Sequence, residues 1–143
     1  MRLHTRIGLD TSVFIYLINT TSPFSAIAAD VFQQLQQQSM TGVTSVLTLT
    51  ELLVKPLQTD RRGLAARYEA LVRSMPNVAV VDIDARVARR AAALRAKHAT
   101  STADSLQIAA ALEHGATAFV TNDRRLRRMD EIALILLADH LDP

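Results

Sequence analysis

Short apolar runs alternate with stretches of helical periodicity along the chain, and this alternation restricts the fold more than any other feature. The runs predict strands at 7–9, 42–44, 78–81, 118–121 and 132–137. Between them, apolar residues recur every three or four positions, as they do in amphipathic helices. Strands that alternate with helices are typical of an α/β sandwich. The sequence therefore predicts a three-layer α/β/α fold with a mainly parallel central sheet.

The segments between the predicted strands contain signals for helix boundaries. We expect helices at 11–18, from 26 to about 38, around Glu51, at 62–74, 85–97 and 101–114. The helix around Glu51 should end before Pro56, because proline lacks a backbone N–H and its ring clashes with the preceding turn. Asp84 stands where an N-cap is expected, and His114 before Gly115 is typical of a helix end. The other histidines have no partner motif, and we assign no histidine a functional role.

The chain has the size and composition of one folded domain, 1–143. Its 143 residues can bury a core without cross-links. The absence of cysteine excludes disulfides, thiolate nucleophiles and cysteine-type zinc sites, and it agrees with a cytoplasmic location. Asp10 interrupts the N-terminal apolar stretch, so no targeting segment is recognised. The longest apolar run, 132–138, is too short to cross a bilayer. We expect a soluble protein with no membrane partner.

Arginine dominates the positive charge, since 14 of the 16 basic residues are arginine. The arginines cluster in three segments, at 61–67, 86–95 and 124–128. A guanidinium group can bind phosphate with two parallel N–H bonds. For any one cluster taken alone, a solvated helix face is the preferred explanation. Beside an acidic metal site, however, such clusters suit a polyanionic substrate.

Four acidic residues lie beside hydroxyl or amide side chains at the edges of apolar segments: Asp10, Glu51, Asp104 and Asp123. Asp10 and Asp123 directly follow predicted strands, and the carboxyl ends of parallel strands meet at one edge of a sheet. Asp104, near a helix start, and Glu51, on a helix, can reach the same edge. This order predicts one pocket built from four separate segments.

Local helix capping is the competing explanation for each acid. Asp10 and Asp123 can cap the segments that follow them, while 48–51 and 101–104 have the spacing of a capping box. Capping requires no long-range order among four acids, so their joint arrangement favours a shared site. Converging carboxylates repel one another unless a proton or a cation relieves the repulsion. Without cysteine, the ligand set suits Mg²⁺ or Mn²⁺ better than Zn²⁺.

Four motifs of the chain resemble those of PIN-domain ribonucleases, most closely the VapC-type toxins of prokaryotic toxin–antitoxin pairs. They are Leu-Asp-Thr-Ser-Val-Phe-Ile at 9–15, Thr-Leu-Thr-Glu-Leu at 48–52, Ala-Asp-Ser-Leu-Gln-Ile-Ala-Ala-Ala at 103–111, and Val-Thr-Asn-Asp at 120–123. Each motif is weak alone. All four in order, with sensible gaps, are fairly specific, and the resemblance covers nearly the whole chain.

The resemblance implies a pocket that binds one or two Mg²⁺ or Mn²⁺ ions, with Asp10, Glu51, Asp104 and Asp123 as its acids. It also implies endonucleolytic cleavage of RNA to a 5′-phosphate and a 3′-hydroxyl, inhibition by an antitoxin, and commonly a homodimer. In such a site, a bound metal would lower the pKa of a water and neutralise charge on the phosphate, and we expect Asp10 and Asp104 to bind this metal directly. Glu51 would bind metal or orient water, and Asp123 would bind directly or through water.

The residues beside these acids are candidates for supporting roles: Thr11, Ser12, Thr121 and Asn122, with Arg124 and Arg125 after Asp123. The four polar residues can hydrogen-bond the carboxylates or a phosphate, although ordinary turn chemistry explains them equally well. The two arginines can hold an RNA backbone, and a solvated helix start is the alternative.

Two other functions compete with a metal-dependent ribonuclease. A catalytically inactive PIN-like module would only bind RNA or protein, but such a module is easier to accept when one of the four acids is missing. A phosphoacceptor receiver domain also uses acids at strand ends, but it normally has a lysine after a late strand. The only lysines here are Lys55 and Lys97. The ribonuclease is therefore the preferred hypothesis.

Overall fold

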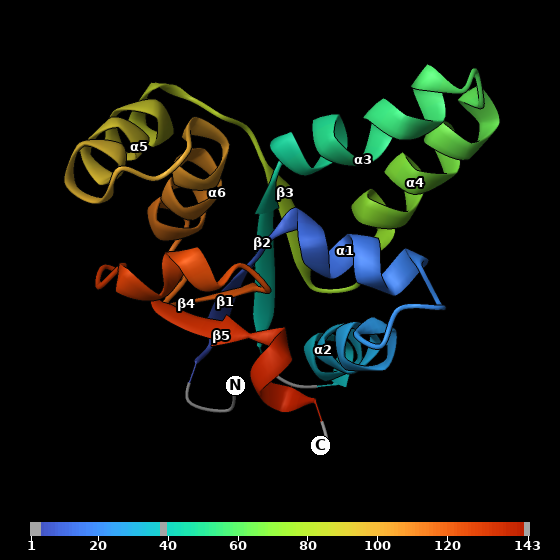
Figure 1. The fold of residues 1–143 in the computed structure, drawn as a ribbon, viewed down its shortest axis with the longest axis horizontal. Coiled ribbons are helices and arrows are strands. Elements are labelled where there is room, and N and C mark those ends of the chain that lie inside the picture. Colours follow the sequence, from blue (N-terminus) through green and yellow to red (C-terminus); the bar gives the residue numbers. More distant parts are fainter. Residues whose placement is uncertain (1–3, 38–39, 142–143) are drawn as a thin grey trace.

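A five-stranded parallel sheet forms the centre of the computed structural model, which describes residues 4–37 and 40–141 (Figure 1). The spatial order of the strands is β3-β2-β1-β4-β5, and every neighbouring pair is parallel. The strands are β1 (Arg6–Leu9), β2 (Thr41–Ser45), β3 (Val78–Val81), β4 (Ala118–Thr121) and β5 (Ala133–Leu136). The predicted parallel sheet is confirmed, with each strand within about a residue of its expected position.

Helices cover both faces of the sheet, which confirms the three-layer α/β/α architecture. Figure 1 shows α5 and α6 on one side and α1 to α4 on the other. The α-helices are α1 (Thr11–Ile18), α2 (Ser25–Gln37), α3 (Leu47–Gln58), α4 (Arg62–Ser74), α5 (Ala85–His98) and α6 (Thr102–Glu113). Two short 3₁₀ helices, η1 (Arg124–Arg128) and η2 (Leu137–His140), follow β4 and β5.

One predicted helix boundary is wrong. The helix that carries Glu51 does not end before Pro56 but continues through it to Gln58. Proline falls in the last turn, where it removes a single backbone hydrogen bond. Its buried ring packs inward, and its carbonyl accepts a hydrogen bond from the N–H of Arg61 at 2.7 Å. The expected end of α2 near Gln38 lies outside the described residues.

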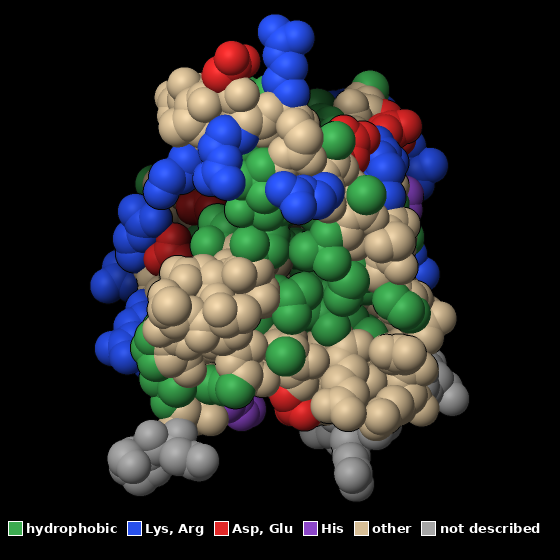
Figure 2. Space-filling view, turned by 90° about the vertical axis from the view of Figure 1, so that its right-hand side faces the viewer, with side chains coloured by type: hydrophobic (Ala, Val, Ile, Leu, Met, Phe, Trp, Pro, Cys, Tyr) green, Lys and Arg blue, Asp and Glu red, His purple; other side chains and the backbone are tan. Residues whose placement is uncertain are grey.

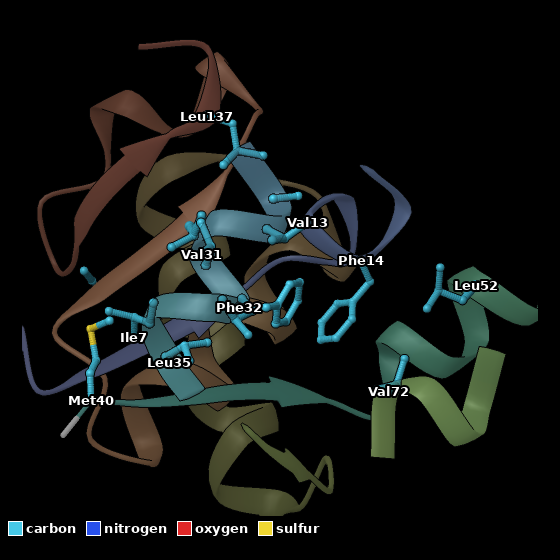
Figure 3. Packing of buried hydrophobic residues seen from close by; sticks show 14 residues of the cluster. Ile7, Val13, Phe14, Val31, Phe32, Leu35, Met40, Leu52, Val72 and Leu137 are labelled. Atoms are coloured by element: carbon cyan, nitrogen blue, oxygen red, sulfur yellow. The ribbon is translucent and has the colours of Figure 1, made fainter. Parts of the chain in front are cut away.

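Two apolar clusters hold the layers together. The first lies between the sheet and α1 to α4, and the second between the sheet and α5 and α6. Figure 3 shows the first cluster, in which Phe14 of α1 and Phe32 of α2 meet with ring centroids 5.0 Å apart. These side chains are buried together with Leu9 of β1. The position of α1, and of the residue that precedes it, is therefore fixed by core packing.

The strand order changes direction at β1, which lies between β2 and β4. The chain moves from β1 to β2 and β3, and then returns across the sheet to place β4 on the other side of β1. Ligand sites of open α/β sheets lie at such switch points, beyond the carboxyl ends of the strands. The N–H of Asp10 donates to the carbonyl of Val120 at 3.0 Å, so the ends of β1 and β4 are joined directly.

The described residues contain no helix that is both long enough and apolar enough to cross a membrane.

Candidate metal centre

Asp10 follows β1 directly and is the N-cap of α1. Its Oδ1 accepts a hydrogen bond from the backbone N–H of Thr11 at 2.8 Å, and its Oδ2 accepts one from the hydroxyl of Thr121 at 2.7 Å. The capping explanation is therefore correct for one oxygen of Asp10. The other oxygen is held by the last residue of β4, a contact that a helix cap does not require.

Glu51 lies on the second turn of α3 with an exposed side chain. Its Oε1 accepts a hydrogen bond from the hydroxyl of Thr11 at 3.0 Å. The alternative capping box at 48–51 does not form, because α3 begins at Leu47 and its N-cap, Val46, makes no side-chain capping bond. Thr11 thus contacts two acids from distant segments, Asp10 through its N–H and Glu51 through its hydroxyl.

Asp104 lies in the first turn of α6, where its backbone N–H donates to the hydroxyl of Ser101 at 3.1 Å. Ser101 is therefore the N-cap, and the carboxylate of Asp104 adds a favourable negative charge near the helix start. That carboxylate is also close enough to Asp10 for its charge to affect the protonation of Asp10. Asp104 and Asp10 are brought together although they come from opposite layers of the sandwich.

Burial raises the pKa of Asp10 from 3.8 to about 6. The negative charges of Asp104 and Glu51 act in the same direction, while the hydrogen bonds from Thr121 and Thr11 partly oppose the shift. The pKa of Asp10 is therefore raised mainly by burial, and the charges of Asp104 and Glu51 add smaller contributions. A bound cation would favour the ionised form that this environment disfavours.

Asp123 follows β4 and differs from the other three acids because it already has a cationic partner. Its two oxygens accept from Arg125, with Nε 3.0 Å from Oδ1 and Nη2 2.7 Å from Oδ2. Its Oδ1 also accepts from the backbone N–H of Arg125 as the N-cap of η1. These bonds hold the pKa of Asp123 below its ordinary value. Asp123 stands at the same sheet edge as Asp10, but its charge is paired.

The carboxylates are near one another without forming a closed coordination sphere. Across the described residues, no three of the four acids have oxygen atoms within 4.8 Å of one another. The donor set nevertheless fits a hard cation, since it consists of carboxylate and hydroxyl oxygens.

Of the four polar residues expected beside the acids, arginines apart, three contact them. Thr11 and Thr121 do so at short range, and Ser12 lies with its hydroxyl 3.5 Å from Asp10 Oδ2. Thr121 also accepts from the backbone N–H of Asp123 at 3.2 Å, so it links two of the acids. Asn122 does not contact them. Its side chain donates to the hydroxyl of Tyr16 and accepts from the N–H of Ala138, which ties β4 to α1 and η2.

A buried polar cluster lies beneath the acids. It consists of Thr11, Thr44, Ser45, Thr48 and Gln107, each no more than 3% exposed. The amide nitrogen of Gln107 donates to the hydroxyls of Thr11 and Thr48, both at 3.0 Å. Gln107, Thr44 and Ser45 are not among the residues expected at the site. The available signals were the two hydroxyl residues at the end of the predicted strand and the glutamine within the apolar helical segment 106–111.

A second group of potential metal ligands lies elsewhere, where α5 ends. Nε2 of His98 lies 2.7 Å from Oε1 of Glu131, and Asp130 is adjacent. Lys97 donates to Asp130 at 3.2 Å, so the negative charge of this group already has a lysine ammonium as its partner. The group joins the end of α5 to the segment before β5. Sequence analysis gave His98 no partner, because its partner lies 33 positions away in the chain.

The arginines of η1 line a depression of about 600 Å³ beside Asp123. Its walls include Arg124, Arg125, Arg127 and Arg128. Arg127 pairs with Asp139 at 3.0 Å, whereas Arg124 and Arg128 form no ion pair within the described part of the chain. A concentration of guanidinium groups therefore adjoins the acidic site.

Hydrophobic side chains are exposed on the helix layer that contains α1 and α3. Figure 2 shows a band of them down the middle of the face seen from the right of Figure 1, with Lys and Arg above and beside it. The helices on this side of the sheet carry three large apolar residues that are strongly exposed: Ile15 (43%), Val54 (46%) and Leu57 (54%). We call these three residues the apolar face. Val54 and Leu57 lie within two turns of Glu51 on α3.

Solved structures with the same fold include chains from several toxin–antitoxin complexes. One belongs to VapBC2 from Rickettsia felis bound to a DNA fragment from their promoter, with a TM-score of 0.71, 18% identity, and coverage of 92% of this chain and 98% of that one. Another belongs to DNA-bound VapBC from Salmonella typhimurium, with a TM-score of 0.67, 22% identity and coverage of 92% and 98%. At these identities the likeness concerns the fold.

A third structure is VapC20 from Mycobacterium tuberculosis, a sarcin–ricin loop cleaving toxin. It has a TM-score of 0.63 and 20% identity, over 79% of this chain and 86% of that one. No curated protein matches the chain. The PIN domain family matches residues 7–132, which include all four predicted acids. The protein therefore belongs to the PIN domain family, as its sequence motifs indicated.

Proposed function

We propose that this protein is a Mg²⁺- or Mn²⁺-dependent endoribonuclease, and that it is the toxin of a toxin–antitoxin pair. The observation that carries the proposal is the environment of Asp10. Its carboxyl lies at the switch point of the sheet, is largely buried, and has its pKa raised by burial and by the charges of Asp104 and Glu51. Such an arrangement costs stability unless a cation or a proton neutralises it, and functional sites commonly contain such groups.

Asp10 and Asp104 would hold the cation directly, with Glu51 as a third ligand or as the group that orients water. Asp123 would contribute directly or through water, and a direct contact requires that Arg125 release one of its oxygens. When bound, a Mg²⁺ or Mn²⁺ ion lowers the pKa of water and neutralises charge that develops on a phosphodiester. Carboxylate ligands and the absence of cysteine favour these two ions over Zn²⁺.

The protein's own groups would align the substrate for in-line hydrolysis. Thr121 and Thr11 fix the two oxygens of Asp10, so that the carboxylate does not rotate freely. Glu51 would accept a proton from the attacking water or orient it. The scissile phosphate would lie between these acids and the arginines of η1, and the products would be a 5′-phosphate and a 3′-hydroxyl.

The arginines of η1 are proposed to hold the RNA backbone. Arg125 is fixed by Asp123 with one guanidinium edge turned to the carboxylate, and Arg124 is exposed beside it. Together with Arg127 and Arg128 they line the depression next to the acids. Guanidinium groups bind phosphate oxygens without regard to base sequence, so they would position the strand while other contacts select it.

We further propose that an antitoxin covers the apolar face. The similar structures from Rickettsia felis and Salmonella typhimurium are VapBC complexes. The apolar face defined by Ile15, Val54 and Leu57 lies on the helix layer that also carries Glu51. A partner bound there would bury exposed hydrophobic surface and approach the acids from one side. We also propose that the protein forms a homodimer, on the resemblance to VapC-type toxins.

A catalytically inactive PIN-like module is the alternative function. It would bind RNA or protein through the same basic and apolar surfaces but would have no use for converging carboxylates. The position of Asp10, buried and close to two further carboxylates, favours the nuclease, because a module without a cation would have no use for this unfavourable grouping of negative charge.

Cleavage of RNA in the presence of defined metals tests the proposal. Purified protein is incubated with a panel of structured RNAs in Mg²⁺, Mn²⁺ or EDTA, beside an Asp10→Asn variant. We expect discrete fragments with 5′-phosphate ends in either metal, none in EDTA, and a loss of at least about 100-fold in the variant. Cleavage that persists in EDTA, or that the variant retains, would rule out the metal-dependent reaction.

A further inference from the structure

The buried polar cluster beneath the acids contains hydrogen-bond donors whose directions are fixed by their partners. The hydroxyl of Ser45 accepts from the backbone N–H of Leu47 at 3.2 Å and donates to Oε1 of Gln107 at 2.7 Å. Ser45 is completely buried, so its hydrogen requires this acceptor. The Gln107 amide is therefore oriented with its oxygen toward β2 and its NH₂ group toward Thr11 and Thr48.

A second branch of the cluster determines the direction of the Thr48 hydroxyl. Thr44 donates to the carbonyl of Leu9 at 2.9 Å, and a carbonyl can only accept. The hydroxyls of Thr44 and Thr48 are 2.7 Å apart, so the hydrogen between them must belong to Thr48. Thr48 has then used its only hydrogen. It cannot donate to Thr11, although their oxygens are 3.1 Å apart.

The hydrogen of Thr11 has two acceptors within reach, the hydroxyl oxygen of Thr48 at 3.1 Å and Oε1 of Glu51 at 3.0 Å. The carboxylate is the stronger acceptor because it is charged and closer. The lone pairs of Thr11 receive the N–H of Gln107, which keeps the hydroxyl from turning inward. All donors along this branch point the same way, from Ser45 through Gln107 and Thr11 to Glu51. A buried network whose donors and acceptors are satisfied is rigid, because a member that turned away would leave a buried partner unpaired.

We propose that Gln107 is a positioning residue that orients the carboxylate of Glu51 through the hydroxyl of Thr11. Glutamate has several rotatable bonds, and Glu51 is exposed on α3. A hydroxyl of fixed direction selects the rotamers that turn its carboxylate toward Asp10. The inference rests on the proposed function in one respect only, namely that an oriented Glu51 serves metal binding and hydrolysis.

Four variants test this role. Gln107→Leu replaces the amide, with its N–H donors and its acceptor oxygen, by an apolar side chain, and Thr11→Val removes only the hydroxyl. Thr11→Ser restores the hydroxyl and is the conservative rescue. Ser105→Ala is the matched control, because it deletes an equally buried hydroxyl of α6 whose partner is Thr100 and no member of the branch that reaches Glu51.

The first measurement needs neither metal nor RNA. Carbon–carbon coupling constants of labelled protein in EDTA report whether Glu51 occupies one rotamer or several. We expect one rotamer in the wild type, Thr11→Ser and Ser105→Ala, and averaging in Gln107→Leu and Thr11→Val. The second measurement is Mn²⁺ affinity by electron paramagnetic resonance, which should fall by about 10- to 100-fold in the same two variants.

A single Glu51 rotamer in both Gln107→Leu and Thr11→Val would overturn the inference. If Gln107→Leu does not fold, Thr11→Val decides the question, because valine fills the space of threonine. If Ser105→Ala averages Glu51 to the same extent, the effect comes from general stability and the assignment to Gln107 is wrong. Failure of the wild type to cleave RNA would refute the proposed function, while the rotamer measurement would still decide the role of Gln107.

Discussion

Asp10 combines two roles that sequence analysis treated as alternatives. One oxygen caps α1, and the other is held by Thr121 from β4. The cap accounts for the position of the residue but not for its raised pKa, which has burial as its main cause and the charges of Asp104 and Glu51 as further causes. A residue can therefore cap a helix and still have an ionised form that its surroundings destabilise.

The raised pKa of Asp10 predicts a pH dependence of stability in EDTA. Its folded-state pKa, about 6, is above its ordinary value of 3.8, so the folded protein binds a proton more tightly than the unfolded chain. The free energy of unfolding should therefore fall as the pH rises from 4 to 6, by roughly 2–3 kcal/mol, and then level off. Urea unfolding at a series of pH values measures it.

Asp10→Asn should remove this decrease and be more stable than the wild type at pH 7 in EDTA. Asparagine keeps an oxygen for the N–H of Thr11 and is an equally good N-cap. Asp84→Asn is the control, since Asp84 caps α5 but has its pKa lowered, mainly by the backbone N–H of Val87. If the free energy of unfolding of the wild type does not change between pH 4 and 6, Asp10 is not buried near Asp104 and Glu51.

Arg125 is predicted to contribute to RNA binding and little to stability. Its ion pair with Asp123 is largely exposed, and exposed pairs stabilise proteins by less than about 1 kcal/mol. Arg125→Ala should weaken RNA binding in EDTA several-fold and reduce the slope of log affinity against log salt by about 0.7. The control is Arg86→Ala, which breaks a similarly exposed ion pair between Arg86 of α5 and Glu113 of α6. It should change neither the RNA affinity nor its salt dependence. Equal binding by both variants would exclude η1 from the RNA site.

At the scale of the elements, β1 and α6 approach closely at Gly8. A Cβ built at this position would lie 2.6 Å from Cβ of Ala111 and 2.7 Å from Cδ1 of Phe119. This approach brings α6, which carries Asp104 and Gln107, against β1, the strand that directly precedes Asp10. The glycine is therefore required for packing between a strand and a helix that both contribute to the site.

Gly8→Ala should destabilise the protein by about 1–3 kcal/mol, because neither neighbour can move without disturbing the core. Gly63→Ala is the control. Gly63 lies in α4 with open space around it, so alanine there should stabilise by about 0.5–1 kcal/mol. Thermal unfolding of both variants provides the comparison. A neutral Gly8→Ala would mean that α6 is less closely fitted to β1 than described.

The elements were largely predictable because their signals are local. Asp84 caps α5, Gly115 follows α6 with a positive φ of 84°, and the apolar runs form the strands. The predicted end of α3 was wrong, because the helix tolerates Pro56 where tertiary packing buries it. The partners of Gln107 and His98 were not predictable. Their contacts join segments far apart in the chain, and a single sequence gives no signal for such pairs.

At the scale of the whole molecule, the site depends on the return of the chain across the sheet. β1 supplies Asp10, β4 supplies Thr121 and Asp123, and helices from opposite layers supply Glu51 and Asp104. The order of the acids along the sequence suggested this convergence, and PIN-family membership agrees with it. The pairing of Asp123 with Arg125 was not expected, because it depends on the fold of η1.

The position of bound Mn²⁺ tests the central claim most directly. Crystals of the protein soaked in Mn²⁺ are measured near the manganese absorption edge, where the anomalous signal locates the ion without reference to any assumed ligand. The account predicts a peak between the carboxylates of Asp10 and Asp104, with Glu51 turned toward it, and no such peak in Asp10→Asn. A peak only at His98, Asp130 and Glu131, the one group of described residues whose ligand atoms already lie within 4.8 Å of one another, would contradict it.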